Sequence, residues 1–279
     1  MNHLFREKAP ITAAGWEEIE KEARRTLRAL LAARRVVDFK GPMDFKGPMG
    51  WGASDVELGR ADPIASPSNA KAVQARLRRI QPLVELRIPF DMPRTELDAI
   101  DRGARDPDLD NVTAAARLIA IAEDRSAFHG YAAAHITGIC EKRAGVAVPL
   151  GASHADYPLA VATALTRLRD EGVEGPFAVV LNEQLYKDLS SRTDSGYPII
   201  SHVQRLVDGD LVWAPGIDGG LVISQRGGDF ELSVGQDFSI GYLEHDTERV
   251  RLYIEESFTF LILTEQAAIP LTTGGKAKP

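Results

Sequence analysis

The chain has 279 residues, of which 44% are hydrophobic and 26% are charged, and its formal net charge is −7. These values are ordinary for a globular protein with a substantial core, and they exclude the broadly basic surface that binds nucleic acid. No apolar run approaches the ~20 residues that cross a bilayer. The N-terminus lacks the apolar core and cleavage site of a signal peptide. Cys140 is the one cysteine, so no intrachain disulfide can form, and we expect a cytoplasmic protein.

A long amphipathic helix is predicted over residues 12–35. Its apolar residues recur at three- and four-residue steps, at Trp16, Ile19, Ala23, Leu27 and Leu30. Thr12 suits the N-cap, and acidic residues precede basic ones along the segment, as the helix dipole favours. The apolar stripe has no obvious partner nearby in the sequence. We therefore expect this helix to dock on a distant segment of its own chain or on another chain.

The hexapeptide Asp-Phe-Lys-Gly-Pro-Met then occurs twice in succession, at residues 38–43 and 44–49. In extended form the second copy would add up to ~20 Å of reach. Its Gly-Pro pairs are turn formers rather than a chemical site. We predict that the copy lengthens or re-routes a hinge before residues 50–68, which lack helical periodicity and indicate a long loop or a β-ribbon arm.

The rest of the chain predicts helices mixed with strands. Residues 84–91 alternate apolar with polar and contain Pro89, which is typical of a half-buried strand near a sheet edge. Helices are predicted at 112–134, 158–171, 182–191 and 198–207, and strands at 177–181, 211–214, 221–224, 230–234 and 250–263. Because the early strand and long helix need the late strands to complete a sheet, we expect an α+β fold with an inserted domain.

No motif commits the chain to catalysis or to a metal. A nucleophile elbow and a phosphate-binding loop are both missing from the sequence. Asp106, Asp108 and Asp110 begin like a calcium loop, but Asn111 stands where glycine is needed, so a helix-capping turn is favoured. Gly227 and Gly228 indicate a hairpin turn. The six histidines are scattered, so we predict no catalytic residue, no metal site and no cofactor.

Many segments in order resemble the encapsulins, shell proteins of the linocin-like group, over residues 4–269. The resemblance is carried by A-P-I-T at 9–12, A-R-R-V-V-D at 33–38, G-P-M-G-W at 47–51, E-L-D-A-I-D-R-G at 96–103, E-D-R-S-A-F-H-G-Y at 123–131, G-V-E-G-P-F-A-V-V-L at 172–181 and the long stretches at 210–242 and 245–260. It implies the major-capsid fold of tailed phages and many copies closing into an icosahedral shell.

The resemblance also implies a division of the chain into parts. These are an N-terminal arm, helix and hinge at 1–50, an extended loop at 51–82, a peripheral domain at 83–134 and 220–270, an axial domain at 135–219 and a disordered tail at 271–279. The axial domain would point at the symmetry axes of the shell.

Encapsulins enclose a cargo enzyme, commonly a dye-decolourising peroxidase or a ferritin-like protein, through a C-terminal targeting peptide. The resemblance implies that this peptide docks between the N-terminal helix and the peripheral domain. The expected pocket consists of Leu27, Leu30, Leu31, Arg34, Asp38 and Phe39, with Asp229, Phe230, Leu232 and Val234 opposite. The alternative is that Leu27, Leu30 and Phe230 belong only to the core.

The resemblance places a pore loop at residues 187–196, where Lys187, Asp188, Arg192 and Asp194 would set the charge seen by entering ions; an ordinary exposed loop is the alternative. Some family members bind flavin through a tryptophan before the E-L-D segment. This chain has Pro93, Arg94 and Thr95 there, so we predict no flavin.

Two other functions stay open from the sequence. One is a soluble protease-like or bacteriocin-like hydrolase, for which we find no nucleophile arrangement. The other is a phage major capsid protein, because that fold is shared. The partners we expect are copies of the chain and a cargo protein, with no nucleic acid and no membrane.

Overall fold

The computed structural model describes residues 3–43, 51–67, 72–151, 153–194 and 196–273, with the side chain of residue 194 excepted. The helices are α1 (Ala13–Leu30), α2 (Arg94–Asp101), α3 (Asp110–His129), α4 (Ile139–Lys142), α5 (Tyr157–Asp170), α6 (Glu183–Ser191) and α7 (Ile199–Leu206). The strands are β1 (Asp38–Lys40), β2 (Asp55–Ile64), β3 (Ala75–Pro82), β4 (Val84–Pro93), β5 (Val148–Pro149), β6 (Phe177–Leu181), β7 (Thr193–Asp194), β8 (Tyr197–Pro198), β9 (Leu211–Trp213), β10 (Gly220–Ser224), β11 (Phe230–His245), β12 (Arg249–Ile262) and β13 (Ala268–Thr272).

Helix α1 begins as predicted and ends earlier. The Thr12 hydroxyl accepts a hydrogen bond from the Gly15 N–H at 3.1 Å, so it caps the N-terminus. The predicted extension to residue 35 is wrong, because the helix ends at Leu30 and a 3-10 turn follows. The physical reason is Asp124, whose carboxylate accepts the N–H groups of Ala32 and Ala33 and replaces the helical hydrogen bonds there.

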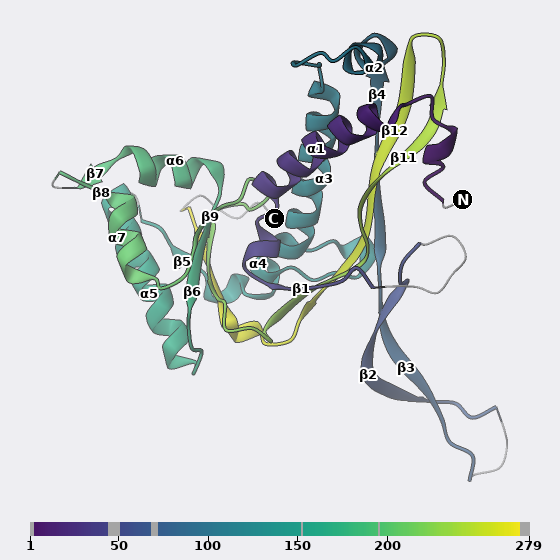
Figure 1. The fold of residues 1–279 in the computed structure, drawn as a ribbon. Helices are drawn as coiled ribbons and strands as arrows, with labels where there is room; N and C mark the ends of the chain where they lie inside the picture. The colour runs from purple at the N-terminus through teal and green to yellow at the C-terminus, as the bar shows by residue number, and fades with distance from the viewer. Residues whose placement is uncertain (1–2, 44–50, 68–71, 152, 195, 274–279) are drawn as a thin grey trace.

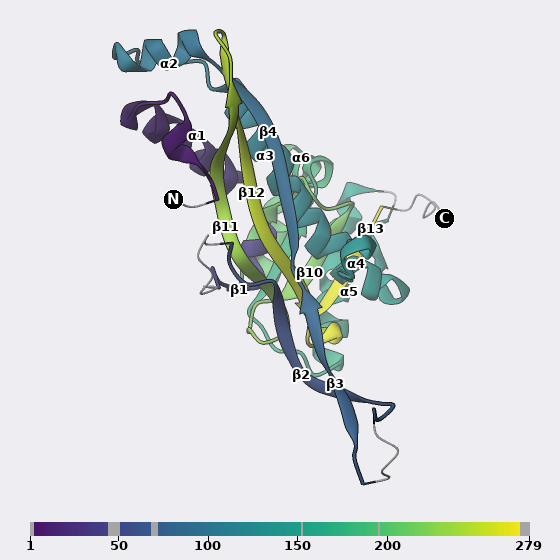
Figure 2. The ribbon, with the colours of Figure 1, turned by 90° about the vertical axis from the view of Figure 1, so that its right-hand side faces the viewer.

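The partner of α1 is helix α3 of the same chain. Ile19, Ala23 and Leu27 are buried in a cluster with Val112, Ile119 and residues of the long strands. Figures 1 and 2 show both helices beside β11 and β12. Helix α3 was predicted to reach residue 134 but ends at His129, because Gly130 adopts φ 86° and turns the chain.

A four-stranded sheet carries the long strands in the order β1-β11-β12-β4. Strand β4 lies at an edge, as Pro89 indicated, and pairs with β12 in an antiparallel register that sets Pro89 opposite Tyr253. Strand β11 is longer than predicted and runs on to His245. This continuation brings residues 237–240 beside α1, a placement that the predicted short strand did not contain.

A five-stranded sheet with order β5-β13-β10-β6-β9 forms the second core. Strand β6 is buried throughout, as its wholly apolar sequence predicted. Strands β10 and β13 also lie in this sheet, beside the strands of residues 135–219, although we expected residues 220–270 to group with the long strands. Leu271 was expected in the disordered tail but is 1% exposed and pairs with Gly220.

The hairpin predicted at Gly227 and Gly228 is wrong, because the two strands that these glycines join do not pair with each other. Gly227 and Gly228 connect β10 to β11, and these strands lie in different sheets. The Gly228 N–H donates to the Asp38 carboxylate at 2.6 Å, so the turn is held by the start of β1. The two glycines therefore pass the chain from one sheet to the other.

The predicted arm is a two-stranded antiparallel ribbon, β2 with β3, that extends away from the rest of the chain (Figure 1). Leu77 and Ile80 are 63% and 50% exposed on it. Arg79 forms a bidentate ion pair with Asp62 across the two strands, and the nearby Arg78 lies 3.7 Å from Glu57. Arg78 and Arg79 are therefore paired with acidic residues of the ribbon itself.

The duplicated hexapeptide is described only in part, because residues 44–49 lie outside the described residues. The first copy forms β1, which pairs in parallel with β11. The Ala53 N–H donates to the Met43 carbonyl at 3.1 Å, so the chain enters the ribbon beside the point where it left β1. The expected effect of the second copy on the hinge, including its ~20 Å of reach, therefore stays a prediction, and the structure fixes only that Met43 and Ala53 on either side of it are hydrogen-bonded.

Candidate functional site

A groove of about 550 Å³ lies between α1, the turn that follows it and strand β11. Leu27 and Leu31 contribute apolar surface from the helical side, and Phe238 and Ile240 contribute it from the strand. The remaining lining residues are Leu4, Arg6, Glu20, Ala23, Arg24, Arg28, Arg34, Arg35, Asp237, Ser239 and Ile254. The groove thus combines an apolar floor with a rim rich in arginine.

The structure places nine of the ten predicted pocket residues in a groove, a neighbouring hollow or the cores, and Phe39 in none of these; Leu27, Leu31 and Phe230 belong to the cores as well. Leu27, Leu31 and Arg34 line the groove. Asp38, Asp229 and Phe230 line a neighbouring hollow of about 140 Å³. Leu30, Leu232 and Val234 are buried in the two hydrophobic cores. Phe39 is 38% exposed, and its ring stands 4.7 Å from the Arg34 guanidinium carbon.

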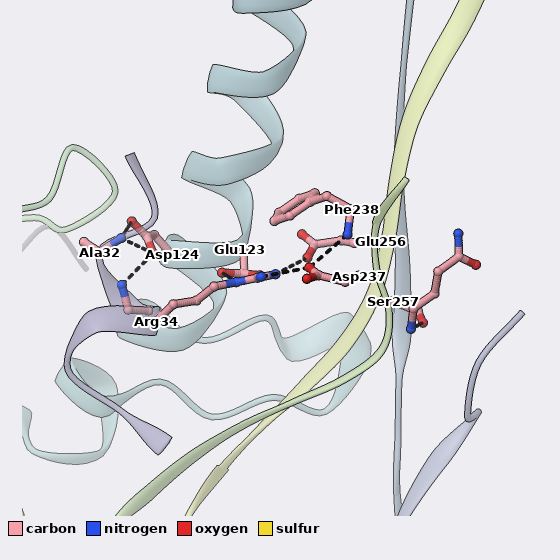
Figure 3. Close-up of polar contacts among 10 residues, drawn as sticks. Ala32, Arg34, Glu123, Asp124, Asp237, Phe238, Glu256 and Ser257 are labelled. Carbon is pink, nitrogen blue, oxygen red and sulfur yellow. Dashed lines mark hydrogen bonds and ion pairs between the residues drawn. The ribbon is translucent and has the colours of Figure 1, made fainter. Parts of the chain in front are cut away.

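Arg34 is the best-fixed polar group of the groove (Figure 3). Its Nε donates to the Glu123 carboxylate at 2.9 Å, and Nη1 donates to Asp237 at 2.8 Å. Nη2 also reaches Glu256 at 3.2 Å, and the Phe238 ring lies 4.7 Å away. Burial opposes the charge, but the hydrogen bond and negative charge of Glu123, aided by Asp237 and Glu256, raise the pKa of the guanidinium above its ordinary value.

Two buried carboxyl groups beside Arg34 have perturbed acidity. Burial, and then the negative charge of Glu123, raises the pKa of Glu256 well above its ordinary value. Glu256 Oε1 has no hydrogen-bond partner among the described residues. Burial also raises the pKa of Asp124 to about 7, although the N–H groups of Ala32 and Ala33 act in the opposite direction. Figure 3 shows Asp124 beside the segment that follows α1 and Glu256 at the guanidinium end of the Arg34 side chain, next to Asp237.

Sequence reasoning missed Glu123, Asp237, Phe238 and Glu256. A signal for Glu256 existed, because it stands two residues from Ile254 and from Phe258, on the inward face of an apolar strand. Glu123 gave a weaker signal as an acid within the apolar positions of α3. Asp237 and Phe238 gave none, since their role depends on how far β11 continues past residue 234.

The predicted pore residues lie on and after α6, in the second part of the fold. Lys187 and Arg192 are exposed. The side chain of Asp188 is 14% exposed and lies 3.5 Å from His154 and 3.7 Å from Arg192. A hydrogen bond from Gln184, with the charges of His154 and Arg192, lowers the pKa of Asp188. Asp194 belongs to β7, and its side chain lies outside the described residues.

Within the described ranges, no group of three or more histidine, cysteine, aspartate or glutamate residues is arranged to hold a metal ion. Over the same part of the chain, no helix combines the length and apolar character needed to span a membrane.

The fold is that of a capsid protein. A virus-like particle protein from Pyrococcus furiosus superposes with a TM-score of 0.61 and 13% identity, covering 92% of this chain and 98% of that one. The protein of Mycobacterium phage Cain gives a TM-score of 0.54 and 12% identity, covering 89% and 92%. At these identities the similarity shows the fold alone.

The sequence comparisons then identify the family. The model of the Linocin_M18 family, described as "Encapsulating protein for peroxidase", matches residues 1–259, so the chain belongs to this family. A type 1 encapsulin shell protein of Rhodospirillum rubrum is 54% identical over 276 residues, or 97% of this chain and 96% of the relative. Another, of Mycobacterium tuberculosis, is 45% identical over 98% of this chain and 100% of the relative.

Proposed function

We propose that copies of this chain close into an icosahedral shell in the cytoplasm and that the groove between α1 and β11 binds the C-terminal targeting peptide of an enclosed enzyme. The groove is the observation that carries the second half of the proposal. Its volume of about 550 Å³ suits a short peptide segment, and its apolar residues suit aliphatic side chains. The family description names a peroxidase as the encapsulated protein, which supports a cargo of that class; a ferritin-like protein is the second cargo that we propose.

The Arg34 cluster gives the groove a rigid wall. Because Arg34 is fixed by carboxylates from α3, β11 and β12, the helix and the long strands keep their spacing whether or not a peptide is present. A preformed groove loses less conformational entropy on binding. One groove binds weakly, but a cargo oligomer that engages several grooves gains from avidity.

For transport, we propose that the end of α6 and the segment after it border a pore. Lys187 on the helix and Arg192 after it are exposed and set the charge of that pore. Asp188 is turned toward His154 and Arg192 and contributes less to the open surface than its sequence position suggested.

The test uses a fluorescent reporter that carries the C-terminal tail of a candidate cargo, either a peroxidase or a ferritin-like protein. The reporter is co-expressed with the shell, and particles are isolated by size exclusion and imaged by negative stain. Reporter fluorescence that co-elutes with closed particles is the expected result. A monomer or dimer under mild conditions would contradict the shell, and empty particles would contradict the cargo peptide.

Ser239→Trp places a bulky ring in the groove, at a half-buried lining position. It should abolish loading and leave the particles intact. Thr166→Trp, at an exposed position of α5 far from the groove in the fold, is the matched control and should load normally.

A further inference from the structure

The groove is basic although the chain as a whole is acidic. Its lining contains Arg6, Arg24, Arg28, Arg34 and Arg35 against Glu20 and Asp237, in a chain of net charge −7. A concentration of one sign of charge in a concave site attracts the opposite sign. An arginine that is already paired with a carboxylate of the chain is less available to an anionic ligand than an unpaired one.

Three of the arginines already have partners within the chain. Arg6 pairs with Glu20 at 2.5 Å and stands 4.1 Å from the Trp16 ring. Arg34 is held by its three carboxylates. Arg35 has a looser ion pair with Asp210 at 3.8 Å. These groups build the walls of the groove and offer little to a ligand.

Arg24 and Arg28 differ, because neither forms an ion pair or a side-chain hydrogen bond within the described residues. Both are exposed and lie one helical turn apart on α1, beside the apolar pair Leu27 and Leu31. Two like charges at this spacing repel each other, so the arrangement is unfavourable until an anion lies between them. By contrast, the adjacent Arg25 is paired with Glu22 and does not line the groove.

The apolar component of the site narrows the class of anion. A nucleic-acid backbone binds open basic surfaces, whereas this groove is lined next to the two cations by half-buried Phe238 and by Leu27 and Leu31, each 8% exposed. The chain's own C-terminal residues are a poor fit, because residues 274–279 carry Lys276 and Lys278 and no acidic side chain. A peptide with aliphatic residues next to a carboxylate matches both components.

We propose that Arg24 and Arg28 form a carboxylate-binding subsite and that the groove selects acidic-apolar peptide segments. An aspartate, a glutamate or the free C-terminal carboxylate of the peptide pairs with the two guanidinium groups, and neighbouring aliphatic side chains contact Leu27, Leu31 and Phe238. This inference rests on the proposed function and specifies the chemistry of the peptide that the groove accepts.

The test compares three reporter tails that are identical in length and aliphatic content. One tail carries two glutamates beside the aliphatic residues, one carries two glutamines and one carries two lysines, and in each a long glycine-serine extension follows, so that the free C-terminal carboxylate lies far from the aliphatic residues in all three. Each reporter is co-expressed with the full-length shell protein. The amount loaded is read as reporter absorbance per shell subunit in purified particles, and tail affinity is read from the salt dependence of release after the particles are opened.

Exposed ion pairs are individually weak, so the glutamate tail should load about threefold better than the glutamine tail and at least about tenfold better than the lysine tail. Arg24→Gln with Arg28→Gln should make the three tails equal. Arg24→Glu with Arg28→Glu should reverse their order. Arg25→Gln is the matched control and should leave the order unchanged, because Arg25 points to Glu22 outside the groove.

The outcomes separate this inference from the proposed function. If Ser239→Trp abolishes loading while the glutamate and lysine tails load equally in the wild-type shell, the groove binds peptide but the carboxylate subsite is wrong. If Ser239→Trp has no effect on loading of any tail, the proposed groove itself is wrong. Two further results would overturn the subsite: nucleic acid released on opening wild-type but not Arg24→Gln/Arg28→Gln particles, or equal gains for all tails when residues 274–279 are removed.

Discussion

Replacing Arg34 by leucine should destabilise this protein far more than replacing its neighbour Arg35. Arg34 hydrogen-bonds to Glu123 and Glu256, whose side chains are both 0% exposed, and to Asp237. Leucine would leave two buried carboxyl groups without a cation. Removing one member of a buried ion pair costs about 3–5 kcal/mol. For a chain of this size, each kcal/mol lowers the Tm by about 2–4 °C, so a fall of about 10 °C is expected.

The assay is thermal unfolding of purified particles at matched concentration, followed by intrinsic fluorescence at pH 5 and pH 8. The loss should be larger at pH 8 than at pH 5, because burial raises the pKa of Glu256 and a protonated Glu256 does not need the cation. Adding Glu123→Gln to Arg34→Leu should recover part of the loss, since one uncompensated charge is removed.

Arg35→Leu is the matched control. Its side chain is 46% exposed and its ion pair with Asp210 spans 3.8 Å, so the change should cost less than about 1 kcal/mol. Equal losses for the two variants, or a loss at Arg34 that does not depend on pH, would refute the assignment of the cluster as a buried, charge-compensated network.

Three further predictions concern acidity, the repeat and the helix cap. The folded-state pKa of Asp124 is about 7 against an ordinary 3.8, so between these pH values the folded state keeps a proton that the unfolded chain loses. The free energy of unfolding should therefore fall by on the order of 4 kcal/mol as the pH rises from about 4 to 7. Asp124→Asn should flatten this dependence in urea midpoints measured across the same pH range. Deleting residues 44–49 should leave the particle diameter unchanged in negative stain, because Met43 and Ala53 already meet, and a changed diameter would mean that the repeat sets curvature. Thr12→Ala should lower the unfolding free energy by about 1 kcal/mol through loss of the cap, whereas Thr12→Ser should have little effect.

Local patterns in the sequence determined most of the elements. The apolar stripe of α1, the wholly apolar β6 and the alternation around Pro89 each report which face of a segment is buried, and burial follows from composition and period alone. Segment-by-segment resemblance determined the capsid fold and the family. Of the ten residues that it implied for the peptide site, Leu27, Leu31 and Arg34 line the candidate groove, and their role there stays a prediction.

Tertiary structure decided what depends on distant segments meeting. Helix α1 ends at Leu30 because Asp124, far along the chain, accepts the next N–H groups. Phe238 and Asp237 complete the groove because β11 continues along β12 past the predicted strand. Met43 and Ala53, on either side of the second copy of the repeat, meet through a backbone hydrogen bond. Neighbouring residues in the sequence determine the helix or strand preference of a segment and which of its faces is apolar. Hydrogen bonds and ion pairs between distant segments form only once the chain has folded, and these position the residues of the candidate groove.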